Sequence, residues 1–229
     1  MNVKEYKVSM EIEGPMAMFA DPAYGSTPYT YPVPTWSQAK AIFETICKVE
    51  SAYIDPTHVE ICKPVKRSSY MLNYRGPLRE NKSIIKGNSL QRHLEVLIDP
   101  CFRIYGIVRK LKDNPQMTTN PEHALQCMFN RNLKRERCRY HPCLGLKECH
   151  ATYFGHLRED TNEIHVQKGE NTILQIMLYC VFNKPRNGAY DPHFKQHVEI
   201  NEGVLRYDIP DKKFPKSHFR KLWEEKEIV

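Results

Sequence analysis

The sequence predicts an α+β fold in which a ferredoxin-like (RRM-like) domain precedes a small antiparallel β-rich domain. Over residues 1–154, extended and helical segments follow in the order β-α-β-β-α-β, the split arrangement of ferredoxin-like domains. After residue 154, short strand-like runs joined by Gly- and Asn-containing turns replace the helices. The 229 residues, 41% of them hydrophobic, suffice for one large domain or two small ones. We therefore predict domains over residues 1–154 and 155–229.

The first strand and the first helix have the clearest patterns. In residues 4–13, apolar side chains alternate with polar ones, as in a half-buried strand. Residues 19–34 contain Asp-Pro, Tyr-Pro and Val-Pro pairs, which stiffen the chain because proline restricts both itself and the residue before it. Thr35 then occupies an N-cap position ahead of apolar residues at helical spacing. We predict a helix over residues 35–48, entered from a stiff aromatic loop.

The next part of the chain is predicted as two strands joined by a long loop. Residues 53–65 form an extended segment. Residues 66–92 are polar and basic and contain two Gly-centred turn signals, so we predict a loop, and a loop of this length is usually functional or disordered. Residues 93–108 have the pattern of a third strand, with a break at Asp99-Pro100.

A second helix begins after residue 119. Asn120 is a good N-cap and Pro121 fits the first helical position. The apolar residues that follow at helical spacing and predict its buried face are Leu125, Met128, Phe129 and Leu133.

Residues 144–154 are predicted as the fourth strand. In the second domain the predicted strands are residues 164–166, 172–182, 197–200 and 204–207, before a charged tail at residues 212–229 that is either a helix or a loose end.

The charge of the chain favours an anionic partner. The formal net charge is +7, and two basic runs with interleaved tyrosines account for much of it. Cations with interleaved aromatic rings suit a phosphate backbone with bases that can stack. The alternative is that both runs are solvated loops. The residues predicted to contact RNA are Tyr31, Lys40, Lys66, Arg67, Arg75, Arg79, Lys82, Lys86, Arg131, Lys134, Arg135 and Arg137.

The cysteines and the apolar runs predict a cytoplasmic protein. The N-terminus lacks the apolar segment of a signal peptide, and the apolar run at residues 173–182 is too short to span a bilayer, so no membrane partner is expected. The 8 cysteines are then expected to be reduced. Cys138, Cys143 and Cys149 lack CxxC spacing, so we expect no metal site, and without a Walker-type loop we expect no cofactor.

Several short motifs occur together in a fixed order. They are FADP at 19–22, YPVPT at 31–35, AKAI at 39–42, CKPV at 62–65, NPEH at 120–123, MF at 128–129 and HPCLGLKEC at 141–149. As a set they resemble the Cas-five family of type I-C CRISPR systems (the Dvulg, or d, subtype) in the RAMP superfamily. The resemblance covers most of residues 4–150, while residues 66–92 and 150–229 match only in composition.

This resemblance implies an activity and a set of partners. Members of the subtype are metal-independent endoribonucleases that cut the precursor CRISPR transcript by attack of a 2′-hydroxyl group of the RNA. They then stay on the crRNA 5′ handle as a subunit of the Cascade complex. The implied partners are the repeat RNA or crRNA 5′ handle, the Cascade large subunit and backbone subunits, and target DNA near the protospacer-adjacent motif.

The resemblance also implies catalytic positions: a Tyr on the first helix and a Lys-His pair at the start of the second. His123 matches the His, and its side chain suits a general acid or base near neutral pH. Glu122 stands at the Lys position and Cys47 at the Tyr position. Two hypotheses therefore stay open: an endoribonuclease using His123, Cys47 and Glu122, or a catalytically degenerate RNA-binding scaffold that caps the 5′ handle. In the second, His123 only lines the helix start.

Overall fold

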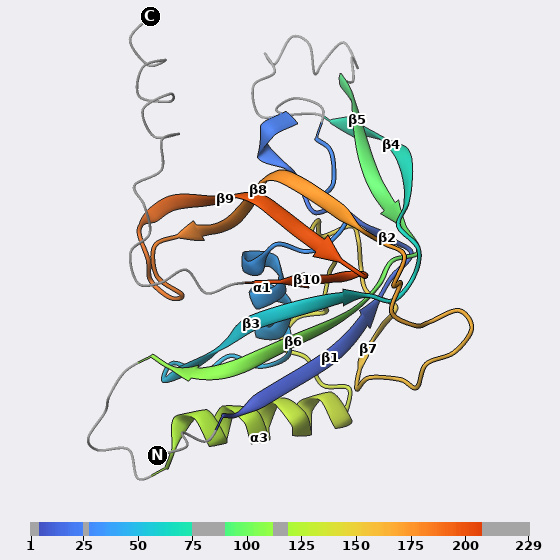
Figure 1. The fold of residues 1–229 in the computed structure, drawn as a ribbon. Helices are drawn as coiled ribbons and strands as arrows, with labels where there is room; N and C mark the ends of the chain where they lie inside the picture. The colour runs from blue at the N-terminus through green and yellow to red at the C-terminus, as the bar shows by residue number, and fades with distance from the viewer. Residues whose placement is uncertain (1–4, 25–27, 75–89, 112–118, 208–229) are drawn as a thin grey trace, which may run out of the picture.

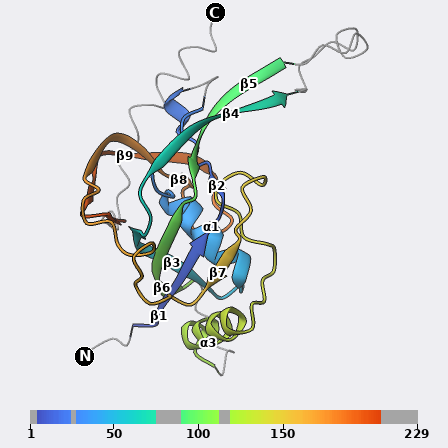
Figure 2. The same cartoon turned by 90° about the vertical axis from the view of Figure 1, so that its right-hand side faces the viewer.

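The computed structural model of the chain describes residues 5–24, 28–74, 90–111 and 119–207. Two antiparallel sheets and two α-helices make up this part (Figures 1 and 2). The larger sheet has the strand order β7-β1-β6-β3-β10-β9-β8, and the smaller one has the order β2-β5-β4. The strands of the larger sheet are β1 (Lys7–Glu13), β3 (Ala52–Ile61), β6 (Cys101–Lys110), β7 (Tyr153–Gly155), β8 (Thr172–Phe182), β9 (Tyr190–Asn201) and β10 (Val204–Arg206). Those of the smaller sheet are β2 (Met16–Ala17), β4 (Lys66–Tyr74) and β5 (Leu90–Ile98).

Half of the larger sheet has the predicted ferredoxin-like arrangement. In chain order, β1, β3, β6 and β7 alternate with the helices α1 (Trp36–Ile46) and α3 (Pro121–Lys134) as β-α-β-β-α-β. In space, the central strands β1 and β6 pair with each other, and β7 and β3 flank them. The α+β prediction is therefore confirmed.

Both helices begin with the caps that the sequence predicts. The Thr35 hydroxyl accepts a hydrogen bond from the Gln38 amide, and the Gln38 side chain accepts one from the Thr35 amide, which completes a capping box. The Asn120 side chain caps α3 by accepting hydrogen bonds from the Glu122 and His123 amides. The helices pack on one face of the sheet and meet at Phe43 and Phe129, whose ring centroids lie 5.6 Å apart. This packing fixes α3 beneath β1 and β6 (Figure 1).

The opposite face of β1 and β6 carries a buried ion cluster. Glu11 is fully buried and pairs with Arg103, at 2.9 Å, and with Arg158. Arg158 also pairs with Glu13. Because Arg158 follows β7, these pairs hold the segment after β7 against the sheet.

The predicted loop at residues 66–92 and the single strand at 93–108 are corrected by the structure. Residues 66–74 form β4, which pairs with β5, and residues 75–89 lie outside the described residues. The pattern over 93–108 belongs to two strands in different sheets, β5 and β6, because the chain turns at Asp99, which has a φ of 49°. The hydrophobic alternation continues through this turn, which is why the pattern resembles one strand.

Two shorter strand predictions were also wrong. Only Tyr153–Gly155 of the predicted strand at 144–154 is a strand. The preceding residues turn at Gly145, whose φ is 93° and where an added Cβ would lie 1.9 Å from the Met18 carbonyl oxygen. Residues 164–166 are not a strand. By contrast, the strand predicted at 172–182 is confirmed as β8.

The C-terminal strands continue the larger sheet. The short β10 pairs with β3 on one side and with β9 on the other, so β8, β9 and β10 extend the sheet beyond β3. The prediction at 197–200 covers the end of the longer β9, and the predicted tail at 212–229 lies outside the described residues. The division into domains at residue 154 stays a prediction.

Candidate nucleic-acid interface

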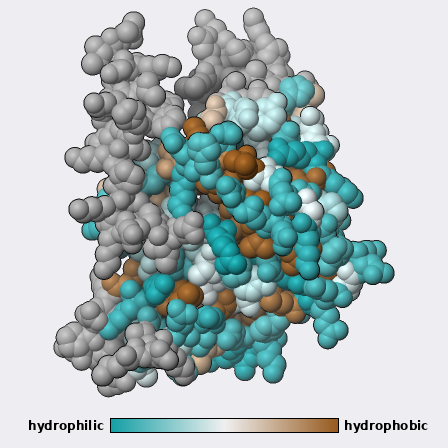
Figure 3. Space-filling model, in the orientation of Figure 1, coloured by the Kyte–Doolittle hydropathy of each residue, from teal (hydrophilic) through white to brown (hydrophobic). Residues whose placement is uncertain are grey.

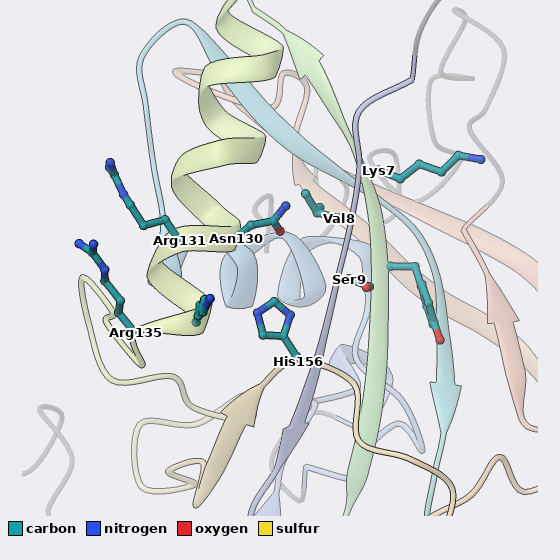
Figure 4. Close-up of a pocket in the computed structure, with 9 residues that line it drawn as sticks. Lys7, Val8, Ser9, Asn130, Arg131, Arg135 and His156 are labelled. Atoms are coloured by element: carbon teal, nitrogen blue, oxygen red, sulfur yellow. The ribbon is translucent and has the colours of Figure 1, made fainter.

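A cavity of about 760 Å³ lies between α3 and the edge of β1 (Figure 4). We call it the edge cleft. It is lined by Lys7, Val8, Ser9, Tyr105, Asn130, Arg131, Lys134, Arg135 and His156. Figure 4 shows Arg131 and Arg135 projecting from the α3 side, with the ring of His156 between α3 and β1. Residues far apart in the chain therefore meet at one edge of the sheet.

The edge cleft exists because β7 is short. β7 pairs only with Glu11–Glu13 of β1, so within the described residues the preceding part of β1 has no strand on that side. The side chain of Gln126 on α3 donates a hydrogen bond of 2.8 Å to the Lys7 carbonyl oxygen and holds the helix beside this edge. A sheet edge without a partner strand leaves main-chain polar groups available to a ligand.

Among the described residues, the charged groups that line the edge cleft are all cations. They are Lys7, Arg131, Lys134 and Arg135, and no carboxylate of the described part of the chain lines it. Arg131 and Lys134 in the last turn of α3 and Arg135 directly after it are exposed, at the end of the helix where its dipole favours cations. Lys7 is also exposed and pairs with Glu5 at 3.4 Å. Such a surface attracts phosphate groups.

A second cavity, of about 680 Å³, provides a contrast. It lies beside β9 and β10, and its lining mixes cations with the carboxylates Glu60, Glu199 and Glu202. The acidic side chains would repel a polyanion there, so the edge cleft is the better candidate for a phosphate backbone.

The structure divides the predicted RNA-binding residues among several places. Arg131, Lys134 and Arg135 line the edge cleft, and Arg137 is exposed just after them. Lys66 and Arg67 begin β4, where they pair with Ile98 and Leu97 of β5, and neither of them lines the edge cleft. The remaining basic-loop residues, Arg75, Arg79, Lys82 and Lys86, lie outside the described residues.

Lys40 and Tyr31 occupy interior positions. Lys40 pairs with Glu44 on α1 at 2.5 Å, and its side chain is only 12% exposed. Tyr31 is 3% exposed, and its hydroxyl accepts a hydrogen bond from the Leu178 amide of β8. Burial raises the pKa of Tyr31, so its phenol stays neutral. A buried ring offers no face on which a base can stack, so contact of Tyr31 with RNA stays an unsupported prediction.

His123 is exposed in the first turn of α3. The Asn120 side chain accepts hydrogen bonds from the Glu122 and His123 amides, at 2.9 and 3.4 Å, and so occupies donors that a phosphate would otherwise use. The His123 ring lies 5.9 Å from the Tyr6 ring, between centroids, and its Nε2 lies 3.3 Å from the Cys127 sulfur. Tyr6, which the sequence did not single out, is thus the phenol nearest to this histidine among the described contacts.

Cys47 and His123 lie near different ends of α3. Cys47 follows α1 and is 6% exposed, and burial raises the pKa of its thiol, while nearby Arg131 lowers it in part. Arg131 stands 8 positions after His123 on the helix, which corresponds to about 12 Å along the axis. The structure therefore does not bring Cys47 to His123.

Glu122 lies in the first turn of α3, where the helix dipole favours an acidic side chain.

Most of the edge cleft outside α3 was not predicted from the sequence. Lys7 and Ser9 are the polar members of the β1 alternation, and Tyr105 and His156 come from distant segments. No local pattern marks these residues, because only the strand order and the short β7 bring them together. The basic run that contains Arg131 and Arg135 was the feature of the sequence that indicated part of this cleft.

The described residues contain neither a group of metal-ligating side chains nor a helix that could span a membrane. Within residues 5–24, 28–74, 90–111 and 119–207, no three His, Cys, Asp or Glu side chains are grouped to hold a metal ion. In the same ranges, neither helix has the length and apolar character needed to cross a membrane.

Known proteins resemble this chain in structure. No protein-family model and no curated protein matches the sequence. A crystal structure of a CRISPR-associated protein has a TM-score of 0.66 and 17% identity, over 90% of this chain and 93% of that chain. The functionally uncharacterized protein SMU1763c from Streptococcus mutans also gives 0.66, at 16% identity, over 92% and 97% of the two chains. A chain of a CRISPR RNA-guided surveillance complex gives 0.50 at 13% identity, over 95% and 98%. The chain therefore has a fold that also occurs in CRISPR-associated proteins.

Proposed function

We propose that this protein is an RNA-binding subunit of a Cascade-type CRISPR complex and holds the crRNA 5′ handle in the edge cleft. The observation that carries the proposal is the cleft itself, where four cations and, among the described residues, no carboxylate line a strand edge that no described strand pairs with. The shared fold with a chain of a CRISPR RNA-guided surveillance complex supports the assignment to this kind of assembly. The large subunit, the backbone subunits and target DNA near the protospacer-adjacent motif are the further proposed partners.

A nuclease-protection experiment tests this function. The protein is mixed with crRNA from its own repeat and treated with a ribonuclease specific for single strands. We expect protection of the 5′ handle by the wild type and loss of protection with Arg131→Gln/Arg135→Gln. Lys184→Gln, which changes an exposed cation in the turn between β8 and β9, is the matched control and should keep protection. Uniform digestion of the handle with the wild type would refute the proposal.

We propose cleavage of precursor crRNA as a second candidate function, because exposed His123 lies beside a phenol. Attack by a 2′-hydroxyl group needs a general base for that hydroxyl and a general acid for the leaving oxygen. His123 is one of these groups in the proposal, and Tyr6, 5.9 Å away between ring centroids, is the other. The buried position of Cys47 gives it no such part, and Glu122 would repel the scissile phosphate. This is why RNA binding without cleavage ranks first.

The two candidates differ in one assay. Pure protein is incubated with its repeat RNA in EDTA. A single cut 3′ of the hairpin, absent when the scissile nucleotide lacks its 2′-hydroxyl group, supports cleavage. His123→Ala should then slow it by about 100-fold or more. Tight binding without a cut supports the scaffold. Cys47→Ser, at a position that the proposed chemistry does not use, is the control.

A further inference from the structure

The edge cleft ends against a pair of stacked rings on the sheet face opposite the helices. His58 on β3 and Tyr105 on β6 are cross-strand partners. Their ring centroids lie 4.2 Å apart, and their planes differ by 8°. Both residues are half-buried and lie on the sheet face opposite α1 and α3, because their strand neighbours Val59 and Ile104 are buried beneath the helices. One flat side of Tyr105 is therefore covered by His58.

Hydrogen bonds hold both rings in place. The Tyr105 hydroxyl donates to Glu60 at 2.8 Å, and His58 Nδ1 lies 3.0 Å from the Thr57 hydroxyl. Burial lowers the pKa of His58 and raises that of Tyr105, so both rings are neutral near neutral pH. A flat ring that is already oriented costs little entropy when a ligand stacks on it.

The other flat side of Tyr105 adjoins the cleft. The cross-strand neighbour of Tyr105 on that side is Ser9, and both residues line the cleft. Because the serine side chain is small, it leaves space above β1 beside the ring. β7 does not extend over this part of β1. The space is therefore a slot with an aromatic wall, open to the cationic part of the cleft.

We infer that this slot takes one unpaired RNA base, which stacks on Tyr105 above Ser9 while its phosphates contact the cations of α3. The inference rests on the proposed RNA-binding function and identifies where a base is held. Aromatic rings beside cationic grooves are the usual means of binding single-stranded RNA. An acidic peptide would suit Arg131 and Arg135 but has no need of a ring, so the combination favours a nucleotide.

The test uses a single-stranded RNA carrying one 2-aminopurine, whose fluorescence falls when the base stacks. The probe is moved through the 5′ handle in a series of oligonucleotides. At one position, wild-type protein should quench it strongly. Tyr105→Leu should abolish that quenching and weaken binding by about 5- to 150-fold, the equivalent of one lost base stack. Tyr105→Phe keeps the ring and should keep the quenching. An abasic nucleotide at that position should weaken wild-type binding as much as Tyr105→Leu does.

A second variant covers the case in which Tyr105→Leu fails to fold. Ser9→Phe fills the slot from the half-exposed neighbour and should also remove the quenching. Equal quenching and affinity in the wild type, Tyr105→Leu and Ser9→Phe would overturn the inference. If Arg131→Gln/Arg135→Gln still weakens binding in that case, the proposed function survives without the slot. Polyglutamate that binds the wild type but not Tyr105→Leu would also contradict a base as the ligand.

Discussion

Glu11 holds the segment after β7 against the sheet, beside the edge cleft. It is fully buried and accepts hydrogen bonds from Arg103 Nε and from the Arg158 main-chain amide, at 2.9 and 3.1 Å. A buried charge without its partner is costly, because water no longer solvates it. Its arginine partners extend from β6 and from the segment after β7, so the cluster connects both.

Glu11→Gln should lower the free energy of unfolding by about 3 kcal/mol, because it leaves two guanidinium groups without their shared counter-charge. Urea unfolding measures this. The matched control is Glu95→Gln, which removes the partner of Arg67, a side chain that is 41% exposed. An exposed pair contributes about 0–1 kcal/mol. Equal losses for the two variants would contradict the role assigned to Glu11.

The neighbouring Glu13 predicts a dependence on pH. Burial alone would raise the pKa of Glu13, but hydrogen bonds from Lys63 and Arg158 lower it overall, below its usual value near 4.5. A lowered pKa in the folded state stabilises the protein above the unfolded pKa, and this contribution is lost as pH falls through the folded pKa. The difference in unfolding free energy between the wild type and Glu13→Gln should therefore be full above the unfolded pKa and shrink as pH falls below it and through the lower folded pKa. A constant difference would contradict this pairing.

At the scale of elements, α1 depends on its N-terminal cap. Thr35 is 2% exposed, and its side chain and that of Gln38 satisfy each other's amides. Thr35→Ala should lower the free energy of unfolding by about 1 kcal/mol, as measured in urea. Thr35→Ser keeps the accepting oxygen and should lose less. If both variants lose the same amount, packing of the Thr35 methyl group and not the cap is responsible.

Elements with a local signal could be predicted from the sequence, and those set by long-range pairing could not. Thr35 and Asn120 mark both helix starts, and the run at 172–182 marks β8, since caps and apolar runs are local patterns. The described side chains of β4, residues 66–71, are all exposed and show no alternation between buried and exposed positions, so its pairing with β5 leaves little trace in the sequence. For the site, Arg131 and Arg135 were predicted from charge. Ser9, Tyr105 and His156 were not, because the strand order alone brings them together.

At the scale of the whole molecule, the position of the edge cleft determines where RNA would lie. The edge cleft adjoins α3 at one end of the molecule, and the strands β4 and β5 extend at the other end (Figure 2). Hydrophilic residues cover much of the face seen in Figure 3, with smaller apolar patches between them. Arg131 lies 8 residues, about 12 Å along the axis, from His123 on α3, so an RNA strand held in the cleft would have to extend along this helix to reach His123.

The salt dependence of RNA binding tests the account most directly. The dissociation constant for single-stranded repeat RNA is measured against salt concentration for the wild type, Arg131→Gln/Arg135→Gln and Lys184→Gln. Each phosphate contact adds about 0.7 to the slope of log affinity against log salt, so the double variant should lose about 1.4 from it. Lys184→Gln should match the wild type. An identical slope in all three proteins, or binding that ignores salt, would contradict the claim that the edge cleft holds RNA.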